Sequence, residues 1–214
     1  MREDMIQKIL DEKAVAIVRG IYGEDCLNLA RALHAGGVNL LEVTFDQKSA
    51  EERQRTCDTI RLLVRELGDR MAFGAGTVTT VEMVEMAREA GGQFIVSPDT
   101  NEAVIRATVA AGMISIPGAL TPTEIAQAHN YGADFVKLFP ANAMGPAYLK
   151  SICAPLSHVR ILAVGGVDAG NVADYMAAGA VGVGVAGCLF KKEWVQAGQW
   201  DRVTEASKAL VSLL

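Results

Sequence analysis

The stretch DFVKLFPAN, residues 134–142, is a short apolar run that contains one lysine and ends near a proline. A run rich in Val and Phe, without polar alternation, is typical of a parallel strand that is buried on both faces. Lys137 in such a strand loses hydration, so its ammonium must find a partner, reach water at a strand end or give up its proton. The stretch therefore predicts a buried parallel strand whose lysine is either paired with a carboxylate or functional.

Similar apolar runs recur along the chain and alternate with amphipathic stretches of about ten to fifteen residues, the spacing of βα units. Eight runs are expected to form strands, at residues 14–20, 39–45, 71–77, 93–99, 113–119, 134–141, 160–166 and 182–188. A helical stretch follows each run, often with a glycine suited to a helix C-cap. Eight such units in about 200 residues predict an α/β fold, a closed (β/α)₈ TIM barrel.

An open, doubly wound sheet is the alternative architecture. Its usual dinucleotide fingerprint, GxGxxG after the first strand with an acid further on, is missing. The GVGVAG of residues 182–187 lies on the last expected strand and does not match that position. We therefore expect one barrel domain over residues 1–214, which begins with a short helix in MREDMIQKILDEK.

Composition excludes several classes of partner. The net charge is -5, and no basic run attracts nucleic acid or an anionic membrane. The charged N-terminus is not patterned as a signal sequence, and no run of about eighteen apolar residues predicts a membrane span. The four cysteines lack CxxC spacing, so free thiols and a cytoplasmic location are expected.

In a barrel, functional side chains gather at the C-terminal ends of the strands. The polar residues at these ends are Arg19, Glu42, Thr44, Thr77, Ser97, Asp99 and Lys137. Side chains alternate along a strand, and the second and sixth strands lie opposite each other in a ring of eight. Glu42 and Lys137 are therefore expected to face each other across the barrel mouth. A purely structural ion pair is the other interpretation, although desolvation makes such a pair a poor stabilising device.

This pair suggests a specific chemistry. Phenylalanine neighbours and a nearby cation such as Arg19 favour the neutral amine of Lys137, which could then attack a carbonyl carbon and form a Schiff base. Glu42 could relay protons to and from the adduct. This chemistry needs no metal or cofactor, and His34, His129 and His158 are scattered without zinc-ligand spacing.

A second signal lies after the last two strands, in AVGGVD and VAGCLF. Gly165, Gly166 and Gly187 would let backbone N–H groups approach a phosphate or carboxylate at the usual anion site of this fold. Paired glycines alone are weak evidence, but their position strengthens it. Asp168 is expected to N-cap the following helix.

Motifs along nearly the whole chain resemble the KDPG/KHG aldolase family. In order, they are AVAIVRG, LLEVTF, GAGTV, FIVSPDTN, IPGALTPTEI, VKLFPA, MGPAYLK and AVGGV. The resemblance implies a class I, Schiff-base aldolase on a (β/α)₈ barrel. Such an enzyme cleaves 2-keto-3-deoxy-6-phosphogluconate or 4-hydroxy-2-oxoglutarate into pyruvate and an aldehyde, glyceraldehyde 3-phosphate or glyoxylate.

The resemblance also implies roles for individual residues. Lys137 would form the imine with the keto carbon, Glu42 would transfer protons, and Thr77 would help hold the pyruvyl carboxylate. The remaining substrate-binding positions would be Arg19, Pro98, Gly165, Gly166, Gly187 and Cys188. The family is generally trimeric, so a homotrimer that binds only a small-molecule substrate is expected.

Three positions depart from the family pattern at the end that binds the distal anion. Asp46 stands where arginine is common after the LEVT segment, Val164 where threonine is common, and Cys188 where serine is common. AVGGV and GPAYLK are similar to the branch that acts on 2-keto-3-deoxy-6-phosphogalactonate. The preferred keto acid and the need for a phosphate therefore stay open.

Two other functions remain compatible with these residues. A phosphosugar isomerase or epimerase would use Glu42 as base and Lys137 as an electrostatic stabiliser, without a covalent adduct. A non-catalytic metabolite-binding barrel would leave both groups idle. Borohydride reduction in the presence of pyruvate separates these functions from an aldolase, because only the aldolase forms a reducible imine.

Overall fold

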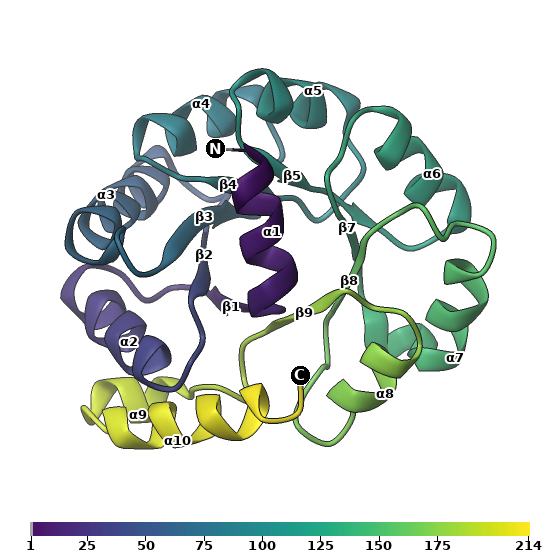
Figure 1. Cartoon of the computed structure of the whole chain (residues 1–214). Coiled ribbons are helices and arrows are strands. Elements are labelled where there is room, and N and C mark those ends of the chain that lie inside the picture. The colour runs from purple at the N-terminus through teal and green to yellow at the C-terminus, as the bar shows by residue number, and fades with distance from the viewer. Residues whose placement is uncertain (1) are drawn as a thin grey trace.

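The computed structural model describes residues 2–214 as a ring of parallel strands enclosed by helices (Figure 1). The strands are β1 (Ala14–Val18), β2 (Leu40–Thr44), β3 (Ala72–Gly76), β4 (Phe94–Val96), β5 (Ile114–Ile116), β6 (Gly118–Ala119), β7 (Val136–Leu138), β8 (Ile161–Val164) and β9 (Gly182–Val185). The helices are α1 (Arg2–Glu12), α2 (Gly23–Ala35), α3 (Ala50–Leu67), α4 (Val81–Glu89), α5 (Glu102–Ala110), α6 (Pro122–Asn130), α7 (Ala141–Cys153), α8 (Val172–Ala177), α9 (Lys192–Gln196) and α10 (Trp200–Val211). The predicted (β/α)₈ barrel and its N-terminal helix are confirmed.

The expected fifth strand consists of two pieces. β5 pairs with β4 on one side, β6 pairs with β7 on the other, and Pro117 lies between them. Proline has no N–H to donate to a strand ladder, which explains the interruption. Its carbonyl still accepts a hydrogen bond of 2.8 Å from the backbone N–H of Lys137. The remaining strands pair in the order β4-β3-β2-β1-β9-β8-β7, so this split strand closes the ring of eight.

Helix α1 lies across the N-terminal end of the barrel (Figure 1). Its buried face packs against the side chains that fill the barrel interior, among them Phe94 and Phe135. Arg2 forms an ion pair of 2.9 Å with Asp134, whose side chain is only 6% exposed and also accepts from the backbone N–H of Ser115. This end is therefore sealed, and the opposite end is left for ligands.

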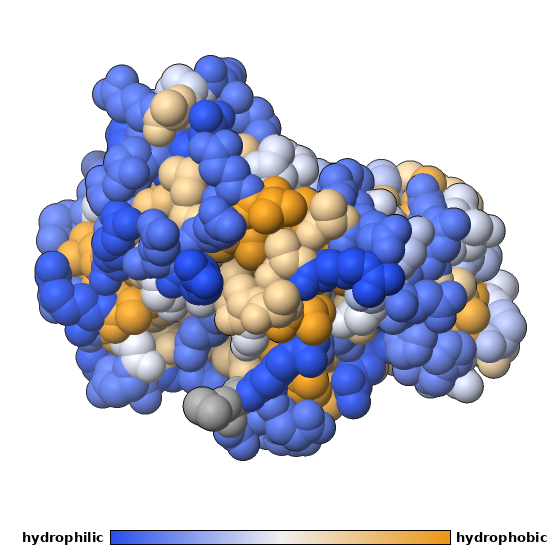
Figure 2. All heavy atoms as spheres, turned by 90° about the horizontal axis from the view of Figure 1, so that it is seen from above, coloured by the Kyte–Doolittle hydropathy of each residue, from blue (hydrophilic) through white to orange (hydrophobic). Residues whose placement is uncertain are grey.

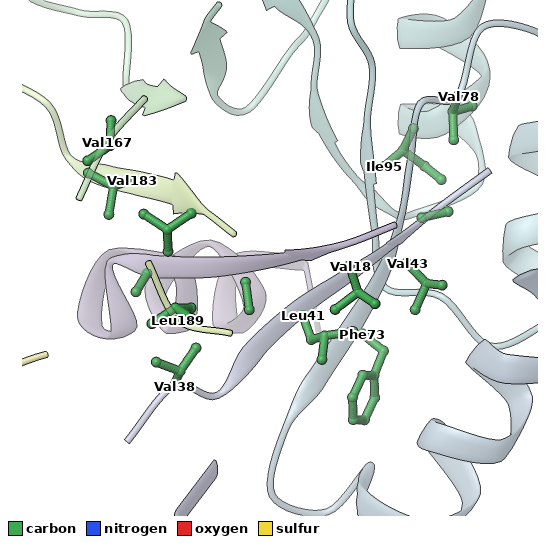
Figure 3. Close-up of a cluster of buried hydrophobic side chains, with 14 of the residues drawn as sticks. Val18, Val38, Leu41, Val43, Phe73, Val78, Ile95, Val167, Val183 and Leu189 are labelled. Carbon is green, nitrogen blue, oxygen red and sulfur yellow. The ribbon is translucent and has the colours of Figure 1, made fainter. Parts of the chain in front are cut away.

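The alternation along β2 determines which side chains enter the barrel. Leu41 and Val43 point outward and pack with Phe73 of β3 in the layer between the strands and the helices (Figure 3). Leu40 belongs to the interior cluster. Glu42, which alternates with Leu41 and Val43, therefore points into the barrel, as predicted.

The same alternation holds for β7, which lies opposite β2 in the ring (Figure 1). Phe135 packs in the interior cluster, while Val136 and Leu138 pack against the helices. Lys137 consequently points inward, on the side of the barrel that faces Glu42.

One expected helix cap is wrong. α8 begins at Val172, and Asn171 is its N-cap residue. The Asp168 carboxylate instead accepts a hydrogen bond of 2.8 Å from the backbone N–H of Gly170 and closes a turn before the helix. The prediction from the sequence began the helix too early, because an Asp side chain is suited both to turns and to helix N-caps.

The view of the surface in Figure 2 is mostly hydrophilic, with apolar residues gathered near the middle of that face. Within residues 2–214, no helix has the length and apolar character needed to cross a bilayer.

Candidate active site

A cavity of about 610 Å³ opens where the strands end, within the size range of small-molecule sites. Its lining includes every site residue predicted from the sequence, namely Arg19, Glu42, Thr77, Pro98, Lys137, Gly165, Gly166, Gly187 and Cys188. The other lining residues are Ile17, Phe139, Val164, Val167, Asp168, Gly184, Val185 and Ala186. Thr44, Ser97 and Asp99, which were also expected at strand ends, are not among them.

Lys137 lies at the centre of β7 and is 7% exposed as a residue. Its Nζ is 4.7 Å from the centroid of the Phe139 ring, a cation–π distance. No carboxylate within residues 2–214 forms an ion pair with it. This geometry argues against a structural salt bridge and leaves Nζ directed at the cavity.

Glu42 is buried at 2% exposure on the facing strand. Burial raises the pKa of its carboxyl above the ordinary value, while the nearby charges of Lys137 and Arg19 act to lower it. Its carboxylate lies over Gly76 of β3, where a β-carbon would collide with Oε1 and lie 2.7 Å from Cδ. A side chain at this position would therefore displace the carboxylate from where it lies. A buried carboxyl with a raised pKa is suited to proton transfer near neutral pH.

Arg19 and Thr77 are hydrogen-bonded to each other at the cavity wall. The Arg19 Nη2 donates a hydrogen bond of 2.8 Å to Thr77 Oγ1. Thr77 has a φ of 58°, in the left-handed region that β-branched residues rarely adopt, at a cost of about 1–3 kcal/mol. Such strain is typical of ligand-binding sites. A guanidinium beside a hydroxyl could bind a carboxylate.

The glycine loop after β8 requires its glycines. Gly165 has a φ of 100° and Gly166 a φ of 70°, both in the left-handed region. A β-carbon on Gly166 would lie only 2.5 Å from Cβ of Asn142. The Gly166 carbonyl accepts a hydrogen bond of 2.9 Å from Nδ2 of Asn171. The loop is therefore held from two sides while its backbone borders the cavity.

The cavity lining also includes Val164, Cys188 and Asp168. Burial raises the pKa of the Cys188 thiol, and the Asp168 charge raises it further. Asp46 is not among the lining residues, and its Oδ1 accepts a hydrogen bond of 2.8 Å from the backbone N–H of Lys48. Asp168 thus places a carboxylate at the cavity, a position that sequence reasoning had assigned to a helix cap.

Comparison with known proteins places these features in a family. The family model for KDPG and KHG aldolase matches residues 5–206. The chain is 35% identical over 192 residues to the 2-dehydro-3-deoxy-phosphogluconate aldolase of Treponema pallidum, covering 89% of this chain and 88% of that protein. It is also 35% identical over 178 residues to the 2-dehydro-3-deoxy-6-phosphogalactonate aldolase of Escherichia coli, covering 83% of this chain and 84% of that protein.

A solved structure of KDPG aldolase from Legionella pneumophila, with pyruvate captured as a covalent carbinolamine, is similar to this fold with a TM-score of 0.83 and 28% identity. The match covers 92% of this chain and 93% of that one. The aldolase interpretation is therefore confirmed over the isomerase and binding-only alternatives. The chain belongs to the KDPG and KHG aldolase family and is a carbon–carbon lyase.

Proposed function

We propose that Lys137 forms a Schiff base with a 2-keto-4-hydroxy acid and that Glu42 transfers the protons that cleave it into pyruvate and an aldehyde. The observation that carries this proposal is the arrangement of the two groups. Lys137 and Glu42 project inward from opposite strands and line one cavity without forming an ion pair. A substrate carbon chain between them would meet the amine on one side and the carboxylate on the other.

Catalysis begins with addition of the neutral Lys137 amine to the C2 keto carbon, which gives a carbinolamine. The Glu42 carboxyl protonates its hydroxyl, which leaves as water, so that a protonated imine (iminium) forms and Glu42 becomes a carboxylate. Phe139 covers the Nζ from one side and keeps the reacting nitrogen out of bulk water.

Bond cleavage follows from the imine. The Glu42 carboxylate takes the proton of the C4 hydroxyl, and the C3–C4 bond breaks. Its electron pair forms the C2–C3 double bond while the C=N pair moves to the cationic nitrogen, which leaves a neutral enamine and releases the aldehyde. Glu42 then returns the proton to C3, and water hydrolyses the resulting iminium to release pyruvate and the free amine, while the proton set free in this step passes back to Glu42. One water is released and one is consumed, so the atoms balance.

Arg19 and Thr77 hold the pyruvyl carboxylate in this proposal, and Pro98 completes the wall beside them. The backbone N–H groups of the glycine loops hold the distal end. The substrates we infer are 2-keto-3-deoxy-6-phosphogluconate or 4-hydroxy-2-oxoglutarate, which would place the enzyme in carbohydrate metabolism. 2-Keto-3-deoxy-6-phosphogalactonate is the alternative, supported by the name of the Escherichia coli relative.

We also propose a cytoplasmic homotrimer. The family resemblance supports the trimer, and the four free cysteines suit a reducing compartment. Light scattering at several protein concentrations tests the trimer, because a monomer mass throughout would contradict it.

The direct test of the function is reduction with borohydride in the presence of pyruvate. We expect one reduced pyruvyl group on a peptide that contains residues 134–142. Lys137→Arg should abolish it because arginine does not deprotonate to attack. Lys150→Arg, an exposed lysine of α7, is the matched control and should label normally. Labelling of the Lys137→Arg protein at another lysine would overturn the assignment.

A further inference from the structure

The peptide unit between Thr77 and Val78 is held at both of its polar groups. The Thr77 carbonyl accepts a hydrogen bond of 2.7 Å from Nε2 of Gln47, and the Val78 N–H donates to the Val96 carbonyl at 3.2 Å. The carbonyl of the preceding residue, Gly76, accepts a hydrogen bond of 2.8 Å from the backbone N–H of Phe45. Both peptides that flank Thr77 are thus constrained from outside.

This constraint matters because Thr77 adopts an unfavourable conformation, with a φ of 58°. The backbone of a β-branched residue leaves the left-handed region unless neighbouring groups hold it in place. The hydrogen bond from the Phe45 N–H and the hydrogen bond to the Val96 carbonyl both follow from strand pairing. The bond from Gln47 does not, because Gln47 lies in the loop between β2 and α3. The Gln47 amide is itself oriented, because its Oε1 lies 3.4 Å from the Thr79 hydroxyl, which donates to it.

We propose that Gln47 is a positioning residue for the substrate carboxylate. By holding the Thr77 carbonyl, Gln47 keeps the Thr77 hydroxyl beside the Arg19 guanidinium, 2.8 Å from Nη2, so that both face the cavity. Gln47 is not itself among the lining residues. The inference rests on the proposed roles of Thr77 and Lys137, and it adds a residue that acts through Thr77.

The test uses pyruvate, the product shared by all the candidate substrates, and measures borohydride labelling of Lys137 against pyruvate concentration. Gln47→Met keeps the length of the side chain and removes the donor. We expect the half-saturating pyruvate concentration to rise about 3- to 10-fold, the effect of one lost hydrogen bond. The maximal labelling rate should change by less than about twofold, because the reacting groups are untouched. Gln54→Met on α3, whose amide donates to Asp58, is the matched control and should behave as wild type.

A double-mutant cycle separates positioning from a general structural effect. In a Thr77→Ala background the hydroxyl is already gone, so Gln47→Met should weaken pyruvate binding no further. An equal loss in both backgrounds, or unchanged half-saturation in Gln47→Met alone, would overturn the inference. If wild-type protein shows no labelling at Lys137, the proposed function fails instead. Normal labelling with an additive cycle would refute only the role of Gln47.

Discussion

Gly76→Ala tests the position of the Glu42 carboxylate. A methyl group at Gly76 would collide with Oε1 of Glu42, lie 2.7 Å from its Cδ and lie 3.0 Å from Cγ2 of Thr44. Ordinary contact between such atoms requires about 3.5 Å, so the carboxylate must move by about 1 Å. A displacement of that size costs about 10²-fold in rate, or about 2.7 kcal/mol in activation free energy. We therefore expect kcat/KM for pyruvate release to fall about 100-fold while the fold persists.

Gly74→Ala on the same strand is the matched control. The nearest atoms to a methyl group there would be in Phe94, with a collision against its ring and a distance of 2.5 Å to its carbonyl oxygen. Overpacking of this kind costs about 1–3 kcal/mol of stability. Thermal melting followed by circular dichroism should therefore show the larger loss in Gly74→Ala, and the pyruvate-release assay the larger loss in Gly76→Ala.

A second substitution sharpens the test. Glu42→Asp shortens the side chain by one methylene, which makes room for the methyl group of Gly76→Ala. The double variant should regain part of the activity that Gly76→Ala loses. Wild-type kcat/KM in Gly76→Ala, or a loss explained entirely by unfolding, would refute the argument that the glycine houses the catalytic carboxylate.

Three further predictions concern charge. Glu42→Gln should lower kcat by about 10²-fold. Because burial raises the pKa of Glu42, the folded protein favours the protonated carboxyl, and wild type loses stability as the pH rises through the raised pKa. The Glu42→Gln variant does not titrate there, so its melting temperature should exceed that of wild type at high pH and equal it at low pH. A wild type that melts above the variant at high pH would contradict the raised pKa. The acid limb of the wild-type kcat/KM profile should lie above the ordinary carboxyl pKa of about 4.3. Asp168→Asn keeps an acceptor for the local turn but removes a carboxylate from the cavity lining. It should raise kcat/KM for 2-keto-3-deoxy-6-phosphogluconate relative to the unphosphorylated acid by about 3- to 10-fold, and an unchanged ratio would show that the carboxylate does not sense phosphate. Asp134→Ala should cost about 1–3 kcal/mol in urea unfolding, because it breaks the ion pair with Arg2 and leaves the Ser115 N–H without its acceptor; unchanged stability would contradict that role.

The barrel was predictable because its determinants are local and repeated. Each apolar run is long enough for one strand, each amphipathic stretch for one helix, and eight repeats leave few other arrangements. The ends of the strands were less predictable. The run expected over residues 134–141 pairs only over Val136–Leu138, because pairing depends on the neighbouring strand as well as on apolar character. The break at Pro117 lies within an expected strand, where proline lacks the N–H for a ladder bond.

The facing of Lys137 and Glu42 also followed from sequence alone, because strand alternation and ring order place both side chains without knowledge of any contact. The tertiary structure decided what surrounds them. Gln47 reaches Thr77 across 30 residues of sequence, and the space over Gly76 exists because β2 and β3 pair in one register. These contacts join loops and strands whose separation in space no local pattern encodes, so only the folded chain determines them.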